Sequence, residues 1–329
     1  MLGFVARRLA IALPLALGAA TLVFVLMESA PGNAADLLLG DRPVPPEVRQ
    51  RIEQVYGLDG PPVERYLRWL GALFLRGELG WSHSRSRPVA TAIREAIPAT
   101  VSLAGAALLL HLLSGILLGV VSAARRGRWT DKSLGFVSLA LYAMPTFWLG
   151  LMSILILSYF VPILPASSIE SVGAAHWSWA HRLADRLWHL VLPASVLGLA
   201  SAAATMRFVR AGVLQAMAQG FVRAARARGL GGKRVLFVHA LRNALIPVIN
   251  FTGVSLPVLL SGSLVIEVVF AWPGMGRLTY DAILAQDYPV ILATTWLATV
   301  MVVLGSLAAD VAMAAIDPRI RLTEQRNTR

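Results

Sequence analysis

The sequence predicts an all-α integral membrane protein that crosses the membrane with six helices. Hydrophobic residues make up 57% of the 329 residues and charged residues only 15%, whereas soluble domains carry about 25% charged residues. Six stretches of at least 19 residues contain no Asp, Glu, Lys or Arg, and a helix of that length crosses a hydrocarbon core of about 30 Å. Because backbone amides find no water there, each stretch should be helical. The stretches are 9–27, 96–124, 133–169, 187–206, 243–266 and 288–309.

The positive charges alternate between the loops and so predict the orientation of the chain. Short loops on the cytoplasmic side of a membrane carry more Lys and Arg than the loops on the other side. Here both ends and every second loop are basic, whereas the opposite loops 170–186 and 277–287 are balanced or slightly acidic. Both termini are therefore expected in the cytoplasm. The basic side carries Arg7, Arg8, Arg125, Arg126, Arg128, Lys132, Arg207, Arg210, Arg223, Arg226, Arg228, Lys233, Arg234, Arg242, Arg319, Arg321, Arg326 and Arg329.

This pattern divides the chain into four parts. The uncharged run in residues 1–30 is 19 residues long, which exceeds the 7–15 residues typical of a signal peptide and predicts a retained helix. The insertion that follows is expected to be helical and extracytoplasmic, with helices that start at Pro-Pro pairs and break near Gly57 and Gly60. The parts are the N-terminal transmembrane helix 1–30, the insertion 31–95, a five-helix core 96–320 with a cytoplasmic loop at about 207–243, and a cytoplasmic tail 321–329.

Metal and redox chemistry are not expected. The absence of cysteine excludes disulfides, Cys-based zinc sites, iron–sulfur clusters and thiol nucleophiles. The extracytoplasmic loop 161–189 holds three histidines without a recognisable set of acidic ligands. Its tryptophans are typical of a membrane interface, and the role of this loop stays open. The residues concerned are His176, His181, His189, Trp177, Trp179 and Trp188.

The glycine-rich stretch RGLGGKR at 228–234 does not fit a phosphate-binding loop. Such a loop needs the motif G-x-x-x-x-G-K-[ST] after a strand. Here Ala227 occupies the position of the first glycine, and Arg234 occupies the position of the Ser or Thr. The chain is therefore expected not to be an enzyme that hydrolyses ATP, and no cofactor is expected in it. A nucleic-acid interface needs stacking aromatics among the basic residues, and only Phe221 and Phe237 are available.

Polar side chains inside the predicted membrane segments are further candidates for function. His111 lies near the middle of the second segment and Glu267 at the end of the fifth, and either is a candidate pathway residue. His111 fits an interhelical hydrogen bond better than a proton relay. No G-x-S-x-G or H-E-x-x-H motif occurs, which argues against an intramembrane hydrolase. A self-contained secondary carrier or channel, which needs ionisable residues aligned across the bilayer, stays the alternative from another class.

The cytoplasmic stretch FVRAARARGLGGKRVLFVHALRN, residues 221–243, has the pattern of a docking element. Its first part combines arginines with small residues, which indicates a short helix that another backbone can approach closely. Gly229 and the Gly231–Gly232 pair predict a break, followed by a second helix from about Lys233. An unpartnered cytoplasmic loop explains the charges but does not require the small residues or the glycines. On the residues alone both interpretations stay open.

The same stretch resembles the cytoplasmic EAA loop of ABC importer permeases, in the form found in the dipeptide/oligopeptide/nickel group. Motifs that resemble this family run along almost the whole chain in matching order and spacing, and they are similar to the dipeptide-permease B type in particular. They are YGLDGPP at 56–62, RGELGWS at 76–82, RPV at 87–89, YAMPTFWLG at 142–150, IEVVFAWPGMGRL at 266–278, DYPV at 287–290 and IDPRIR at 316–321.

The resemblance implies the fold and the partners of a type I ABC importer permease, in a bacterial or archaeal cytoplasmic (inner) membrane. A second, related permease subunit completes a heterodimer, and two cytoplasmic ATPases bind the ATP and Mg. An extracytoplasmic binding protein delivers di- or oligopeptides; nickel, glutathione or another small solute is the alternative cargo. The lipid bilayer is the remaining partner, and nucleic acid is not one.

The resemblance also implies a docking surface for one ATPase. Ala224, Ala225 and Gly229 fall on the Ala-Ala and Gly of the family motif. Arg223 replaces the Glu of the motif, and Arg242 occupies the position of its closing Pro. The docking surface is therefore cationic, and acidic residues are expected on the ATPase opposite it. The surface is expected to comprise Phe221, Arg223, Ala224, Ala225, Arg226, Arg228, Gly229, Leu230, Lys233, Arg234, His239, Arg242 and Asn243.

Overall fold

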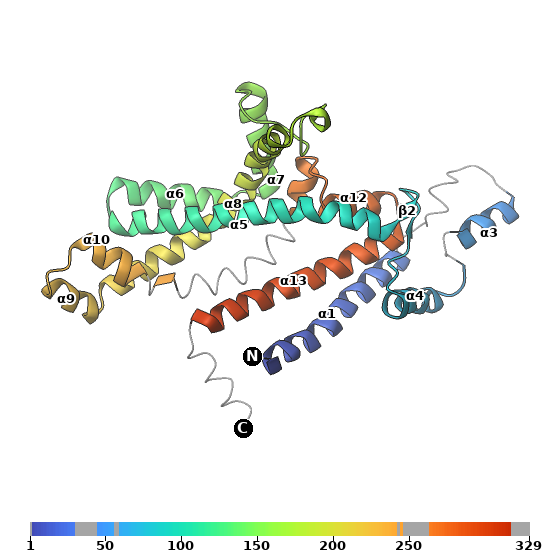
Figure 1. Ribbon diagram of the computed structural model, residues 1–329, viewed down its shortest axis with the longest axis horizontal. Helices are drawn as coiled ribbons and strands as arrows, with labels where there is room; N and C mark the ends of the chain where they lie inside the picture. Colours follow the sequence, from blue (N-terminus) through green and yellow to red (C-terminus); the bar gives the residue numbers. More distant parts are fainter. Residues whose placement is uncertain (1, 30–44, 56–58, 242–243, 246–262, 317–329) are drawn as a thin grey trace. The chain divides into compact units, whose positions relative to one another are not determined.

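The chain folds into two compact units of helices (Figure 1). The first unit comprises Met1–Thr100 and Pro273–Val303, and the second comprises Val101–Trp272 and Leu304–Arg329. Each unit therefore joins segments that are far apart in the sequence. The structure is a computed structural model, and it describes residues 2–29, 45–55, 59–241, 244–245 and 263–316.

The first unit begins with the long helix α1 (Leu2–Ser29), against which part of the insertion packs. The described insertion contains α3 (Pro46–Val55), α4 (Pro62–Gly71) and the π-helical turn η1 (Ala72–Arg76). Both α-helices start at a proline, whose fixed φ angle suits the first helical position, so the predicted Pro-initiated helices are confirmed. Arg65 of α4 forms an ion pair with Glu28 of α1, and the Tyr66 hydroxyl lies within hydrogen-bond distance of Thr21 Oγ1.

A short hairpin connects the insertion to the core of the first unit. Strands β1 (Trp81–Ser82) and β2 (Arg87–Pro88) pair antiparallel, with Ser82 opposite Arg87. The buried Asp287 Oδ2 accepts hydrogen bonds from Ser82 Oγ (2.7 Å), from Ser84 Oγ (2.6 Å) and from the Ser84 amide (3.1 Å). This carboxylate fixes the hairpin to the turn between α12 (Met275–Leu284) and α13 (Tyr288–Ile316).

The core of the first unit surrounds the start of α5 (Val89–Ala124). The amide of Met275 donates a hydrogen bond of 2.8 Å to Thr100 Oγ1, which fixes the start of α12 against α5. Helix α5 begins seven residues before the predicted segment 96–124, because the charged Arg94 and Glu95 interrupt the apolar run without interrupting the helix. The buried core residues are Val89, Ala92, Ile93, Ala96, Met275, Leu278, Ala282, Val290, Ile291 and Ala293.

The second unit contains the rest of α5 and a set of helices around α8 (Trp179–Met217). The other elements are α6 (Trp129–Ala143), α7 (Thr146–Ile154), η2 (Leu155–Phe160), η3 (Ala174–His176), α9 (Gly220–Ala227), α10 (Gly232–Arg234) and η4 (Val235–Ala240), and residues 263–269 are helical. Helix α6 lies next to α5 in Figure 1 and packs against α8. Between α6 and α8, Ser138 Oγ donates to the Ala203 carbonyl (3.0 Å), and the Arg207 guanidinium lies 4.7 Å from the centre of the Tyr142 ring.

Glycines let α5 and α8 approach each other closely. A Cβ atom at Gly119 would lie 2.6 Å from the Cβ of Val209, and one at Gly115 would lie 2.8 Å from the Cβ of Thr205. On α8, a Cβ at Gly198 would lie 2.7 Å from a backbone oxygen of α5. Small residues at helix contacts are a common means of close packing between membrane helices. The two helices therefore meet at a distance that larger side chains would exclude.

Three helices of the described chain are long and apolar enough to cross a membrane. They are Val89–Ala124, Trp179–Met217 and Tyr288–Leu307, and they overlap the predicted segments 96–124, 187–206 and 288–309. These three predicted segments are therefore confirmed as long apolar helices. The first predicted segment, 9–27, lies within the helix α1, whose apolar stretch Leu13–Ser29 is shorter than these three spans. Most of the fifth predicted segment, 243–266, lies outside the described residues.

The third predicted segment, 133–169, is not one straight helix. Helix α6 and the pair α7–η2 meet at an angle of 105°, and together they are apolar enough to make a fourth span. The bend lies at Pro145, which has no amide hydrogen and disfavours helical geometry at the preceding residue. Met144 accordingly has an extended ψ of 136°.

Candidate functional site

Residues 220–241 form a short helix, a tight turn and a second helical stretch. Helix α9 ends at a turn in which the Gly229 amide donates to the Arg226 carbonyl (2.9 Å) and the Leu230 amide to the Ala225 carbonyl (3.3 Å). This pair of bonds defines a Schellman motif, and its central residue, Gly229, has a φ of +80°, which favours glycine. Helix α10 follows at once and continues as η4. The predicted helix, break and second helix are confirmed.

An apolar inner face holds α9 in place. Val222 and Ala225 lie one helical turn apart, are each only 1% exposed, and pack with the buried Val235 of η4. Met217 and Leu230 pack against the same cluster. Ala225 was expected on the ATPase-docking surface together with Ala224, but its side chain packs inside the chain against Val235.

The outer face of α9 combines small side chains with cations. Ala224 and Ala227 are exposed, and so are the adjacent Arg223 and Arg226. Phe221 is 40% exposed at the start of the helix. Since no Asp or Glu occurs between residues 187 and 266, no carboxylate from this stretch of the chain can neutralise the arginines.

The remaining residues of the expected docking surface lie in the turn and after it. Arg228, Gly229 and Arg234 are exposed, and Leu230 is half-buried. The backbone of Lys233 and His239 is helical, and their side chains are not among those described. Arg242 and Asn243 lie outside the described residues.

Ten residues before α9, Arg210 of α8 binds a buried carboxylate. Asp131, whose side chain is 7% exposed, accepts hydrogen bonds from Arg210 Nε (2.7 Å) and Nη2 (2.9 Å). It also accepts a bond from the Gly127 amide (2.9 Å) and one from Ser122 Oγ. One carboxylate thus joins the end of α5, the turn before α6 and the helix that leads into α9. We refer to Asp131, Arg210, Ser122 and Gly127 as the Asp131 clamp.

The clamp was not foreseen from the sequence, although a signal for it exists. Asp131 is the one acid in the basic stretch 125–132. A carboxylate in such surroundings is expected to pair, but Arg125, Arg126 and Arg128 are nearer in sequence than Arg210. Only the packing of α8 against α5 and α6 selects the partner that lies 79 residues away.

The two polar candidates inside the predicted membrane segments are both buried. His111 Nε2 lies 2.6 Å from Thr205 Oγ1, so that the imidazole joins α5 to α8 beside the glycine contacts. This geometry agrees with an interhelical hydrogen bond. Glu267 is fully buried in the helical residues 263–269, and its carbonyl accepts a bond of 2.8 Å from the Trp272 amide. A role of either residue on a transport pathway stays a prediction.

The loop rich in Trp and His is held by ion pairs between its own charged residues. Glu170 accepts bonds from Arg182 (2.8 and 3.0 Å) and from Arg186 (2.9 Å), and these bonds lower the pKa of Glu170 from 4.5 to about 2. Asp185 caps the loop through the Ser171 amide and hydroxyl, at 2.7 Å each, and lies one turn before His189 on α8. In the part of the chain that the structure describes, no group of three His, Asp or Glu residues is placed to hold a metal ion.

The sequence matches two family models that together cover most of the chain. Residues 115–322 match a model described as binding-protein-dependent transport system inner membrane component. Residues 1–104 match the N-terminal model of the same membrane components.

Curated relatives match over nearly their full length. The oligopeptide transport system permease protein AppB of Bacillus subtilis is 38% identical, over 97% of this chain and 99% of its own. The di/tripeptide transport system permease protein DppB of Pseudomonas aeruginosa is 36% identical, and the dipeptide transport system permease protein DppB of Escherichia coli K12 is 33% identical; each match covers 98% of this chain and 99% of the relative.

Among solved structures, the fold is similar to that of a chain of the MetNI methionine ABC transporter in inward-facing conformations. Two crystal forms give TM-scores of 0.52 and 0.53 at 16% identity, and each match covers 69% of this chain and 96% of that one. This likeness shows the fold alone. The family models and the curated relatives lead to one assignment: the chain belongs to the family of binding-protein-dependent transport system inner membrane components and is a multi-pass permease subunit of an ABC importer.

Proposed function

We propose that this permease carries di- and oligopeptides and forms half of their translocation path. The support for this cargo is that relatives at 33–38% identity, matched over almost their whole length, are permeases of oligopeptide, di/tripeptide and dipeptide transport systems. Nickel, glutathione or another small solute is the alternative cargo. Identification of the ligand that co-purifies with the cognate binding protein decides between them, and a binding protein that holds a metal ion but no peptide contradicts the proposal.

The proposed topology has six transmembrane helices with both termini in the cytoplasm of a bacterial or archaeal cell. Residues 1–30 form the first helix, 31–95 the extracytoplasmic insertion, 96–320 the five-helix core and 321–329 the tail. The alternation of basic and balanced loops supports this orientation. Residues 207–243 then lie on the cytoplasmic side, where the ATPases are expected.

The proposed partners are a second permease subunit in a heterodimer, two cytoplasmic ATPases and an extracytoplasmic binding protein. ATP and Mg are expected on the ATPases and not on this chain. The helical start at Gly232 supports this assignment, because a phosphate-binding loop would need a preceding strand and a Ser or Thr after Lys233.

The helix α9 is proposed to dock in a groove of one ATPase, and its outer face is the observation that carries this proposal. The exposed Ala224 and Ala227 allow a close backbone approach, while Arg223 and Arg226 provide charges for acidic residues on the partner. The buried Val222 and Ala225 keep α9 fixed to η4, so that a push on α9 moves the segment as one body.

The Asp131 clamp is proposed to pass this movement to the membrane helices. ATP can drive a conformational change only if it favours one arrangement of the ATPases over another, and the docked helix must follow that arrangement. Arg210 lies on α8 between α9 and the apolar part of that helix, and Asp131 ties it to α5 and α6. Three helices therefore receive the displacement together.

A negative charge introduced on α9 or in the turn that follows it tests the docking proposal. Arg226→Glu and Gly229→Asp are expected to abolish dipeptide uptake and co-purification of the ATPase, while the amount of chain inserted in the membrane stays unchanged. Arg125→Glu reverses an exposed charge on the same basic side outside α9 and serves as the matched control. Unchanged uptake in both Arg226→Glu and Gly229→Asp, or an equal loss in the control, contradicts the proposal. Uptake by the purified chain without any ATPase would instead support a self-contained carrier.

A further inference from the structure

Helix α4 packs along the end of α1 in the first unit (Figure 1). Thr21, Phe24 and Glu28 lie on one face of α1 and span two helical turns. The Tyr66 hydroxyl lies within hydrogen-bond distance of Thr21 Oγ1, and its ring centre lies 5.2 Å from that of Phe24. Arg65 forms an ion pair with Glu28. Helix α4 therefore lies beside the last two turns of α1, within about 12 Å of the end of its apolar stretch.

Apolar side chains on α4 extend beyond its contact with α1. Val63 and Leu67 lie one helical turn apart and are 67% and 58% exposed. Leu75 on η1 is 86% exposed. Glu64 and Arg68 are also exposed, and they lie about 100° further round the helix than Val63 and Leu67. The exposed surface of α4 thus has an apolar side and a charged side, which is typical of a helix that lies in a membrane interface.

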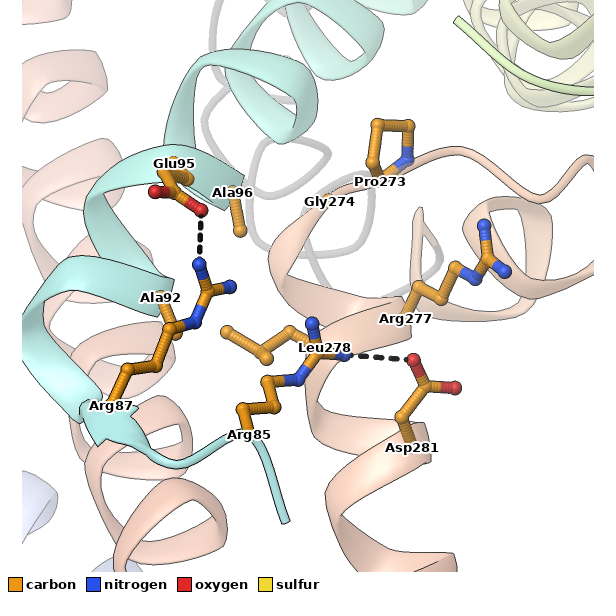
Figure 2. Close-up of a pocket in the computed structure, with 10 residues that line it drawn as sticks. All are labelled: Arg85, Arg87, Ala92, Glu95, Ala96, Pro273, Gly274, Arg277, Leu278 and Asp281. Atoms are coloured by element: carbon orange, nitrogen blue, oxygen red, sulfur yellow. Dashed lines mark hydrogen bonds and ion pairs between the residues drawn. The ribbon is translucent and has the colours of Figure 1, made fainter. Parts of the chain in front are cut away.

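The hairpin that follows η1 marks the aqueous side of the insertion. It forms one wall of a polar pocket of about 320 Å³, together with the starts of α5 and α12 (Figure 2). Arg85 pairs with Asp281 at 3.0 Å. Arg87 pairs with Glu95 at 2.7 Å, and all four of these side chains are partly exposed. Exposed ion pairs of this kind belong in water, because charged groups are costly to place in hydrocarbon. The hairpin therefore lies in water, although it directly follows the exposed apolar surface of η1.

The surface next to α4 indicates what covers its apolar side. On the part of α1 that carries α4, Leu22, Val25 and Leu26 are each more than half exposed. They belong to the apolar stretch Leu13–Ser29 of a multi-pass membrane protein, so lipid is expected around them. The exposed apolar side chains of α4 lie at the same level along α1 and meet the same surroundings.

We propose that α4 and η1 lie in the extracytoplasmic interface of the membrane, with Val63, Leu67 and Leu75 among the lipid acyl chains. The inference rests on the proposed topology, which places the end of α1 at that surface. A helix in the interface is immersed by about 5–10 Å, which agrees with its position beside the last two turns of α1. The rings of Tyr66 and Trp69, whose centres are 6.0 Å apart, lie on the same helix, and such aromatic side chains are common at membrane interfaces. The lipid contact holds the insertion at the membrane surface.

The test attaches an environment-sensitive fluorophore to single positions of the complete permease–ATPase complex in lipid nanodiscs. The chain contains no cysteine, so each substitution supplies one labelling site in it, and the unmodified complex gives the background. The four variants are Leu67→Cys, Leu75→Cys, Glu64→Cys and Leu22→Cys. Two quenchers are compared: phosphatidylcholine that carries bromine near the headgroup end of its acyl chains, and iodide in the buffer.

The labels at positions 67 and 75 are expected to be quenched by the brominated lipid and several-fold less by iodide. The label at position 64, on the charged side of the same helix, is the matched control and should show the reverse order. The label at position 22, on the exposed side of α1, is the membrane reference and should behave like position 67.

Three results overturn the proposal. Iodide quenching as strong at position 67 as at position 64 shows that the apolar side lies in water. Quenching by neither agent at position 67 shows that another protein subunit covers it. Iodide quenching at position 22 overturns the proposed topology and this proposal with it. The measurement uses neither transport nor ATP hydrolysis, so a failure of the proposed cargo or coupling would leave the four results unchanged.

Discussion

The substitution Asp131→Asn removes the charge of the Asp131 clamp and keeps its size. The carboxylate accepts four hydrogen bonds, two of them from Arg210. Loss of one partner from a buried ion pair costs about 3–5 kcal/mol, whereas an exposed pair contributes about 0.2–1 kcal/mol. The side chain of Asp131 is 7% exposed and that of Arg210 is 36% exposed, so the clamp lies between these limits. We expect a loss of about 2 kcal/mol of unfolding free energy, which weakens the clamp about 30-fold at about 1.4 kcal/mol per factor of ten.

The expected functional effect is a loss of coupling. The variant should insert, bind the ATPases through α9 and hydrolyse ATP, but it should transport fewer peptides per ATP in proteoliposomes. The reason is that α8 can then move at Arg210 without carrying α5 and α6 with it. A double-mutant cycle with Arg210→Ala isolates the pair from the other hydrogen bonds of Asp131.

Glu170→Gln is the matched control for this variant. It also removes a carboxylate that binds arginine through Nε and Nη2, but at the start of α8, at the opposite end of that helix from Arg210. It should lower stability and leave the number of peptides per ATP unchanged. The account is refuted if Asp131→Asn retains the unmodified ratio, or if Glu170→Gln lowers the ratio to the same extent.

Three other predictions concern the turn, the helix contact and the Trp/His loop. Gly229→Ala should destabilise the turn by about 1 kcal/mol, because the φ of Gly229 is +80°, whereas Gly229→Asn should be tolerated better. The affinity of each variant for the ATPase measures this difference, and equal affinities contradict the role of the turn. Gly119→Ala should lower the free energy of unfolding by about 1–3 kcal/mol, because the added methyl group meets α8, whereas a methyl group at Gly105 meets no atom within 4 Å and should have little effect. Thermal unfolding measures both variants, and equal effects contradict the close approach of α5 and α8. Because the pKa of Glu170 falls from 4.5 to about 2 on folding, its contribution to stability is full above pH 4.5 and is lost as the pH falls toward 2. The rate of hydrogen exchange in the loop should rise over that pH range. Glu170→Gln should abolish this pH dependence.

The sequence was sufficient for features that depend on neighbouring residues. The uncharged runs predicted α5, α8 and α13, because their apolar length alone sets the need for a helix in a membrane. Gly229 and the following glycines predicted the break after α9, since a positive φ suits glycine. The proline at the start of α4 predicted that boundary for the same local reason.

Features that depend on the packing of distant segments were not predictable in this way. The pairing of Asp131 with Arg210 needs the contact of α6 with α8, and nearer arginines compete for the same carboxylate in the sequence. The pocket joins Arg85 and Arg87 to residues almost two hundred positions later. The inward direction of Ala225 depends on Val235, which reaches the inner face of α9 only after the turn.

The central claim, that the outer face of α9 contacts an ATPase, is tested most directly by site-specific cross-linking. The chain contains no cysteine, so a single introduced thiol reports on one position. Ala224→Cys, on the exposed face, is predicted to cross-link to the ATPase groove in the assembled complex, and Ala225→Cys, on the face that packs against Val235, is predicted not to. Cross-linking at Ala225 as strong as at Ala224, or none at Ala224 in a complex that hydrolyses ATP and transports peptide, would contradict the claim.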